Sequence, residues 1–249
     1  MAYPGVWLVS LAVAFAYWRF TRGTTTSRAA LAGWLGVIMV EVALDWPIGP
    51  LAAGYLATAH AVQFLLIVLV APPLLLIGAR RGIEAWFLAN SERTRRTVGA
   101  ITHPLMAAIA FNVVIITTHV PGVNDALMRS QLGAFASDLS WLVGGVWFWW
   151  PIIVDAPPRP LFGVPFKLLY LFLGTLVHEG IAIVMLMREH PMYAVYELAP
   201  RATAMSALTD LEIAGGVMEL GGAAIVFGIL TVMFFRWTGG MGAERTARR

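Results

Sequence analysis

Seven long apolar stretches run along the chain, and short segments between them hold most of its charged residues. The stretches cover residues 4–20, 29–48, 55–78, 98–120, 132–154, 166–187 and 209–235. A helix needs roughly 20 residues to cross about 30 Å of hydrocarbon, and most of the stretches reach that length. The pattern predicts an all-α fold, a polytopic bundle of about seven transmembrane helices that forms a single domain over residues 1–249.

The cations are distributed unevenly between the two ends of the predicted helices. Of the 17 Lys and Arg residues, 14 fall in alternate gaps and in the C-terminal tail; the other three are Arg129, Arg188 and Arg201. Short cytoplasmic loops of membrane proteins carry an excess of Lys and Arg. We therefore expect the N-terminus to lie outside and the C-terminus to lie in the cytoplasm.

Composition supports a membrane protein and excludes several other classes. Hydrophobic residues make up 59% of the chain and charged residues 12%, which is too apolar for a soluble domain of 249 residues. The basic balance indicates contact with the headgroups of a lipid bilayer and gives no platform for nucleic acid. Cysteine is absent, so neither a thiolate metal site nor an iron–sulfur cluster can form, and soft-metal chemistry would need Met or His.

Tryptophan is concentrated in the fifth stretch, which carries Trp141, Trp147, Trp149 and Trp150. Trp is enriched at membrane–water interfaces, where its ring sits at headgroup level. We interpret these four side chains as an interfacial belt rather than a cofactor site.

Ionisable side chains inside the predicted helices gather toward the outer face. Charges at a helix centre cost roughly 2.5–3.5 kcal/mol each, so pairing, a bound cation or water must offset them. The residues expected to converge near the outer surface are Asp45, His60, His119, Asp210 and Glu212. Imidazole with carboxylate suits Cu(II), Zn(II) or Fe(II), and an added Met would suit Cu(I). The alternative is that each side chain is a structural hydrogen-bond clamp or is simply hydrated.

A second polar pair, His178 and Glu179, is expected near the middle of the membrane. The pair is either a structural clamp or part of a second metal site. No nucleophile–base arrangement, phosphate-binding loop or zincin motif appears, so we favour a non-enzymatic protein. A membrane enzyme would need a carboxylate–His metal centre built from His178, Glu179, Asp210, Glu212 and Glu219.

The segment from Thr58 to Ala79 carries His60, Gln63, Ala-Pro-Pro-Leu-Leu and Gly-Ala in that order. It resembles the CtaG-like cytochrome c oxidase assembly family, whose pattern is His-x-x-Gln-His followed by Ala-Pro-Pro-Leu-Leu and Gly-Ala. Further matches follow in the family's order over residues 45–220: His103-Pro104, His119-Val-Pro121, Leu139-Ser-Trp-Leu, Phe148-Trp-Trp-Pro151, Met192-Tyr193, Asp210, Gly215 and Met218.

The resemblance implies a multi-pass protein of the bacterial cytoplasmic membrane that helps to mature a respiratory haem–copper oxidase, with copper as its metal and oxidase subunits as its partners. His60, His119, Asp45 and Asp210 are then the first candidate ligands. Phe64 replaces the second His of the motif, and Asp138 and Glu219 stand near other altered positions. Fewer imidazoles and more carboxylates favour a harder metal than Cu(I). Two alternatives stay open: a permanent subunit of a membrane redox complex and the metal enzyme described above.

Overall fold

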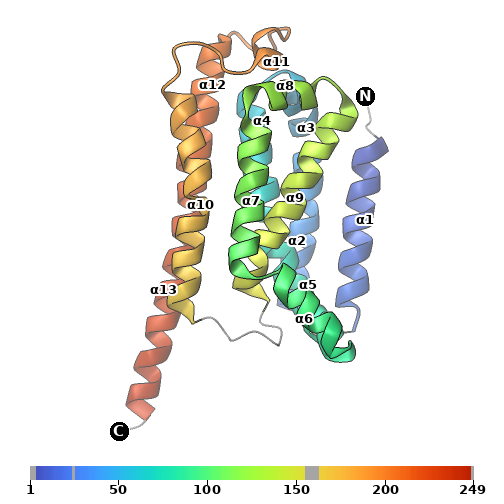
Figure 1. The fold of residues 1–249 in the computed structure, drawn as a ribbon, viewed down its shortest axis with the longest axis vertical. Helices are drawn as coiled ribbons and strands as arrows, with labels where there is room; N and C mark the ends of the chain where they lie inside the picture. The colour runs from blue at the N-terminus through green and yellow to red at the C-terminus, as the bar shows by residue number, and fades with distance from the viewer. Residues whose placement is uncertain (1–3, 24–25, 155–162, 248–249) are drawn as a thin grey trace.

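The computed structural model describes residues 4–23, 26–154 and 163–247, and every regular element in these ranges is helical (Figure 1). Single long helices form much of the bundle: α1 (Pro4–Thr21), α2 (Ser27–Leu44), α7 (Pro104–His119), α9 (Gln131–Ile153) and α10 (Val164–Leu186). Four shorter helices lie at the ends of the bundle: α3 (Ile48–Gly54), α6 (Glu92–Ile101), α8 (Pro121–Met128) and α11 (Ala194–Glu197). The all-helical prediction is confirmed.

Two long rods each contain a π-helical turn. One consists of α4 (Ala57–Leu65), η1 (Leu66–Val70) and α5 (Ala71–Ala89), and the other of α12 (Ala207–Gly216), η2 (Val217–Gly221) and α13 (Gly222–Ala247). A π-turn adds one residue to a helical turn and is frequent at functional sites. In this fold, η1 directly follows the helix that carries His60, and η2 contains Glu219.

Length and composition qualify four helical segments of the described chain as membrane spans: Ser27–Leu44, Ala57–Ala89, Val164–Leu186 and Ala207–Gly240. A fifth qualifies if α6 and α7, which meet at 47°, are taken together. The structure therefore agrees with a membrane helical protein, while the count of seven crossings and the positions of the termini stay predictions. Following the charge distribution, we call the end that carries α3, α8 and α11 the outer end (top of Figure 1).

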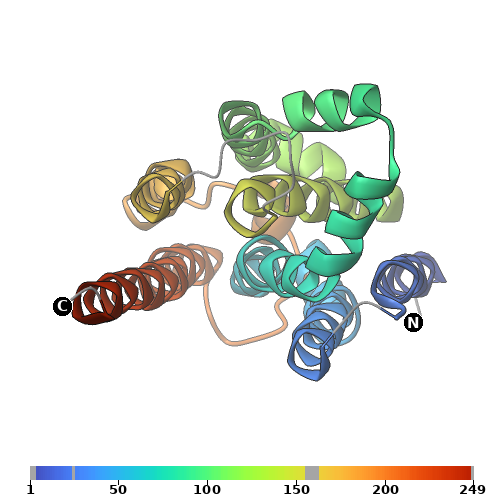
Figure 2. The ribbon, with the colours of Figure 1, turned by 90° about the horizontal axis from the view of Figure 1, so that it is seen from below.

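The interior is closely packed where small residues let helices approach. A Cβ added at Gly36 of α2 would lie 2.8 Å from the backbone nitrogen of Leu75 in α5. Close approach of this kind is typical of membrane helix pairs. Figure 2, seen from below, shows α1 at one edge of the bundle and α13 at the other.

The interpretation of the Trp cluster as a belt is wrong for two of its members. Trp141 and Trp149 are fully buried. Their indole nitrogens donate to Thr118 Oγ1 (2.9 Å) and to the Val68 carbonyl oxygen (3.0 Å). Each indole has found an acceptor on a neighbouring helix, so these two side chains are core residues.

Candidate functional site

Asp210 determines where α4 begins. Its Oδ2 accepts a hydrogen bond from the backbone nitrogen of Ala57 (2.7 Å). Its Oδ1 accepts from the nitrogen (3.1 Å) and the hydroxyl (2.6 Å) of Thr58. The first N–H groups of a helix have no partner within the helix, so a buried carboxylate from α12 satisfies them here. Asp210 thereby fixes the helical turn that carries His60, and both of its oxygens are in use.

His60 and His119 lie together near the outer end of the bundle. They come from α4 and α7, are 6% and 5% exposed, and have ring centroids 6.4 Å apart. We call them the outer His pair. His119 is the last residue of α7, and its Nδ1 lies 2.8 Å from the carbonyl oxygen of Ile115. Since a carbonyl can only accept, Nδ1 carries the proton and Nε2 keeps its lone pair.

Aromatic rings surround the outer His pair. The Trp141 ring centroid lies 4.9 Å from that of His60 and 5.8 Å from that of His119. Tyr196 lies 5.8 Å from His60, and Phe64 lies 5.1 Å from His119. The pair is therefore enclosed by apolar faces that exclude bulk water.

Polar contacts to the pair are few. Nδ2 of Asn124 lies 3.4 Å from Nε2 of His60. Among the described residues, His60 Nδ1, His119 Nε2 and Asn124 Oδ1 are buried without a hydrogen-bond partner. Nδ2 of Asn124 also donates to the Thr118 carbonyl oxygen (3.5 Å), and a carbonyl can only accept, so this contact favours the same orientation of the amide. His60 Nε2 is then the unprotonated nitrogen that accepts from Asn124, and a ligand would displace Asn124 to use its lone pair. The lone pair of His119 Nε2 has no partner among the described residues.

The short helix α11 covers the pair from the outer side. The Asp125 carboxylate accepts from the backbone nitrogens of Ala194 (3.2 Å) and Val195 (3.1 Å) at the start of α11. Tyr193 donates to the His119 carbonyl oxygen (3.1 Å), and Tyr196 donates to that of Ala52 (2.8 Å). Burial raises the pKa of both phenols, so each keeps the proton that it donates.

His178 and Glu179 of α10 form a separate pair. His178 Nε2 lies 3.3 Å from Glu179 Oε1, and the imidazole is fully buried. The Phe64 ring neighbours an imidazole of each pair, with its centroid 5.1 Å from that of His119 and 6.1 Å from that of His178.

The remaining candidates do not complete either pair. Asp45 ends α2, where its Oδ1 accepts from the backbone nitrogen of Trp46 (2.8 Å), and Glu212 is exposed. Within the described ranges, no group of three or more His, Asp or Glu side chains is placed to hold a metal ion. The predicted convergence of five residues is thus reduced to two imidazoles. Of the larger set needed by a metal enzyme, Glu219 hydrogen-bonds Glu179 beside His178, whereas Asp210 caps α4 and Glu212 is exposed. Which residues bind a metal stays a prediction.

The family model described as "Cytochrome c oxidase caa3 assembly factor (Caa3_CtaG)" matches residues 11–239. This match covers most of the chain and includes every residue of both pairs. The chain belongs to the Caa3_CtaG family. No curated protein and no solved structure matches it.

The resemblance seen in the sequence is therefore confirmed, and Caa3_CtaG membership supports a role in assembly of cytochrome c oxidase. The structure shows where one departure from the family motif, Phe64, lies in the bundle. Phe64 stands where the motif has its second His, and in this Caa3_CtaG protein its ring packs near both His119 and His178.

Several residues around the outer His pair were not predicted from the sequence. Asn124 and Tyr196 belong to segments between the predicted crossings, and Trp141 was assigned to the interface. Nothing in the local sequence around Asn124 indicates that its carboxamide faces His60, which lies 64 positions earlier in the chain. Only the three-dimensional packing brings it there.

Proposed function

We propose that this protein assists the assembly of a haem–copper oxidase by holding copper on His60 and His119 at the outer end of the bundle. The observation that carries the proposal is the pair of buried imidazoles from two helices, each able to offer a lone pair. Copper is the cargo in this account, and the family supplies the oxidase as its destination.

The donor set fits copper. Imidazole nitrogen binds copper, and a ligating His commonly donates its other ring N–H to a backbone carbonyl, as His119 does to Ile115. Two imidazoles leave coordination positions free for a ligand from an acceptor protein. A site with free coordination positions suits an ion that is transferred to another protein.

The surroundings favour copper of low charge. Neutral imidazoles in an aromatic cage do not compensate a cation, and the cost of an uncompensated charge rises with its magnitude. Asp138 and Glu219, the acids near the altered family positions, do not complete a three-residue site with the pair. We therefore favour Cu(I) over the harder metals that the sequence suggested.

Metal analysis of the purified protein tests the binding step. After incubation with Cu(I) and removal of the excess, the wild type should retain about one copper per chain, a ratio set by one two-His site. His60→Ala and His119→Ala should each retain less than a tenth as much. His190→Ala is the matched control because His190 is exposed outside the predicted crossings. Equal copper in all four proteins would refute the site.

The assembly step needs a separate readout in the cell. Deleting the protein should leave oxidase subunits in the membrane but lower the copper content of the isolated oxidase, and His190→Ala should restore it while His119→Ala should not. Oxidase with a normal copper content in the deletion strain would contradict the loading role.

A further inference from the structure

An apolar groove runs along the side of the bundle between α1 and α9. α1 packs against α2 and α5, and α9 packs against α5 and α7, so neither covers the space between them. An outer hollow of about 700 Å³ and an inner hollow of about 670 Å³ lie in this space. Together with the narrow pocket between them we call these the α1–α9 groove.

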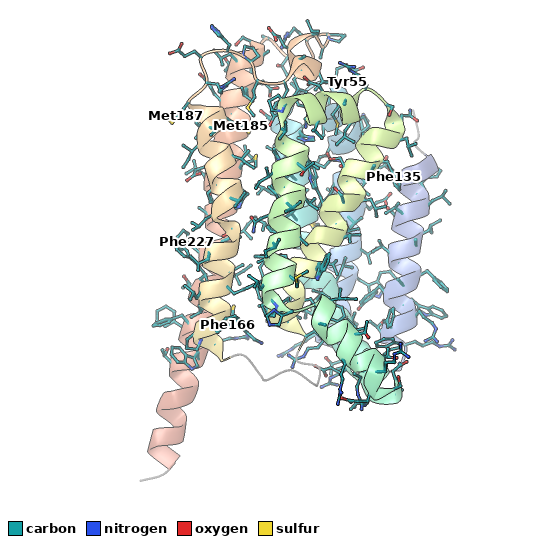
Figure 3. All side chains as sticks on the ribbon, in the orientation of Figure 1. Tyr55, Phe135, Phe166, Met185, Met187 and Phe227 are labelled. Carbon is teal, nitrogen blue, oxygen red and sulfur yellow. The ribbon has the colours of Figure 1, made fainter. Side chains whose placement is uncertain are left out.

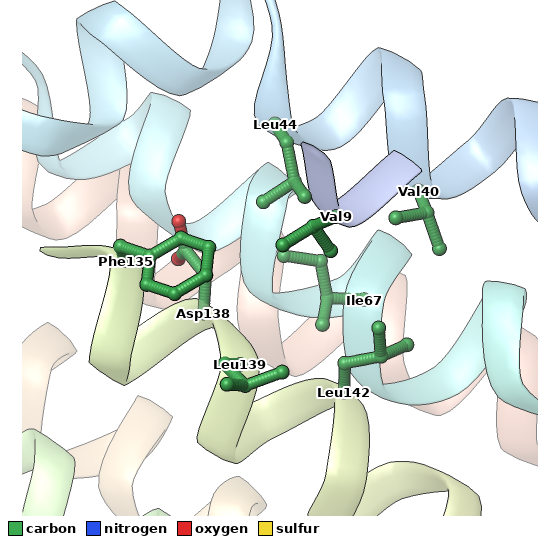
Figure 4. A pocket seen from close by; sticks show the side chains of 8 residues that line it. All are labelled: Val9, Val40, Leu44, Ile67, Phe135, Asp138, Leu139 and Leu142. Atoms are coloured by element: carbon green, nitrogen blue, oxygen red, sulfur yellow. The ribbon is translucent and has the colours of Figure 1, made fainter. Parts of the chain in front are cut away.

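The three pockets follow one another along α9, and the middle one is a constriction of about 10 Å³. The narrow pocket shares Val9 and Asp138 with the outer hollow and shares Leu139 and Leu142 with the inner hollow (Figure 4). Along α9 the lining extends from Ser130 to Trp150. Twenty residues of helix correspond to about 30 Å, the thickness of the hydrocarbon layer. The groove therefore matches an occupant that spans both leaflets.

Two alanines lie between larger side chains on the α1 side, and glycines lie at the outer rim. Ala12 faces the outer hollow and Ala16 the inner one. A Cβ added at Gly5 or Gly54 would meet no atom within 4 Å, so the rim is open there. The labelled rings of Tyr55 and Phe135 lie in the outer half of the molecule (Figure 3). Small side chains of this kind allow the close approach of another helix.

Asp138 is the acid that lines the constriction of the groove. Its only hydrogen-bond donor among the described residues is Gln63 Nε2, at 3.3 Å from Oδ2. The side chain is partly buried, and an acid at membrane depth with one donor is costly. The cost falls if an occupant of the groove offers a second hydrogen-bond donor at the same depth. Asp138 lies seven residues from the start of α9, about 10 Å along the helix.

We propose that the α1–α9 groove binds one transmembrane helix of an oxidase subunit, and that this helix places a hydrogen-bond donor opposite Asp138. A lipid spans a single leaflet and its acyl chain has no donor, so it satisfies neither the length of the groove nor its acid. The identity of the partner rests on the proposed function, whereas the groove does not depend on copper.

Photo-crosslinking in cells that make the oxidase tests the occupant. A photoreactive amino acid replaces Ala12 or Ala16 in the groove, or Leu11 as a control that is exposed on α1 but does not line the groove. We expect adducts from positions 12 and 16, but not 11, that map by mass spectrometry to a transmembrane segment of an oxidase subunit. Adducts with lipid alone, with a second copy of this chain, or at equal yield from position 11 would overturn the proposal.

Filling the groove tests the same contact without a crosslinker. Ala12→Trp and Ala16→Trp should lower the amount of oxidase subunit that co-purifies in mild detergent by about tenfold or more, because an overpacked interface loses its fit. Asp138→Leu should lower it about fivefold. Leu11→Trp and Phe15→Trp, on the exposed face of α1, should leave it unchanged.

Copper retention separates the two proposals. Each Trp variant should bind as much copper as the wild type, which also shows that it has folded. If Ala12→Trp and Ala16→Trp keep both copper and the oxidase subunit, the groove proposal fails and the copper site stands. If His119→Ala keeps copper while the groove variants lose the subunit, the copper proposal fails and the groove stands.

Discussion

Two sides of this bundle are built in opposite ways. Around the outer His pair, α4, α7, α11 and α12 are tied together by the carboxylates of Asp125 and Asp210 and by the hydroxyls of Tyr193 and Tyr196. Between α1 and α9 the helices stand apart and leave an open groove. Both sides are apolar in sequence. On the closed side polar cross-links reinforce the packing of apolar faces, whereas the faces along the groove stay available to another molecule.

The largest effect is expected from Asp210→Ala. The change leaves the buried Ala57 N and the partly buried Thr58 N without an acceptor, which should destabilise the protein by about 3 kcal/mol. Thermal unfolding in one detergent should show a large drop in midpoint. The neighbouring Glu212→Ala should change little because Glu212 is exposed. Equal midpoints for the two variants would show that Asp210 does not hold the closed side together.

A pair of glycine substitutions compares a closed contact with an open one. Gly36→Ala puts a methyl group 2.8 Å from Leu75 N and should destabilise by about 1–3 kcal/mol. Gly54→Ala on the groove rim meets no atom within 4 Å and should change stability by less than about 0.5 kcal/mol. Measured by thermal unfolding, a loss at position 54 as large as that at position 36 would mean that the groove is closed in the membrane protein.

Removing a hydroxyl from α11, which covers the outer His pair, should have an intermediate effect on stability. Tyr196→Phe loses the hydrogen bond to the Ala52 carbonyl oxygen and should cost about 1 kcal/mol. Tyr55→Phe serves as the control, since Tyr55 is exposed on the groove side. Hydrogen exchange of the α11 backbone should rise in Tyr196→Phe alone; unchanged exchange would show that this hydroxyl does not fix the cover.

The smallest change in stability is expected at the groove acid. Asp138→Leu replaces a carboxyl group held by a single donor, so the isolated protein should gain about 0.5–1 kcal/mol in thermal unfolding. The same variant should bind the oxidase subunit less well. A clear loss of stability would assign Asp138 to the internal framework and not to partner binding.

Much of the fold could be predicted, because a long apolar stretch in a membrane forms a helix to satisfy its own backbone hydrogen-bonding groups. The location of His60 and His119 near the outer end also followed from their position along those helices. The role of Asp210 as the cap of α4 could not be predicted. Asp210 belongs to α12 and lies 153 positions from Ala57, so no local sequence pattern indicates the contact. Nor does the sequence distinguish Trp141, which is buried between helices, from a Trp in the headgroup layer.

X-ray absorption spectroscopy of the Cu(I)-loaded protein can identify the atoms that bind copper. If the two outer imidazoles hold the ion, the first shell is dominated by imidazole nitrogen, is lost in His119→Ala and persists in His190→Ala. A first shell of carboxylate oxygen, or a spectrum unchanged in His60→Ala and His119→Ala, would contradict binding at these imidazoles.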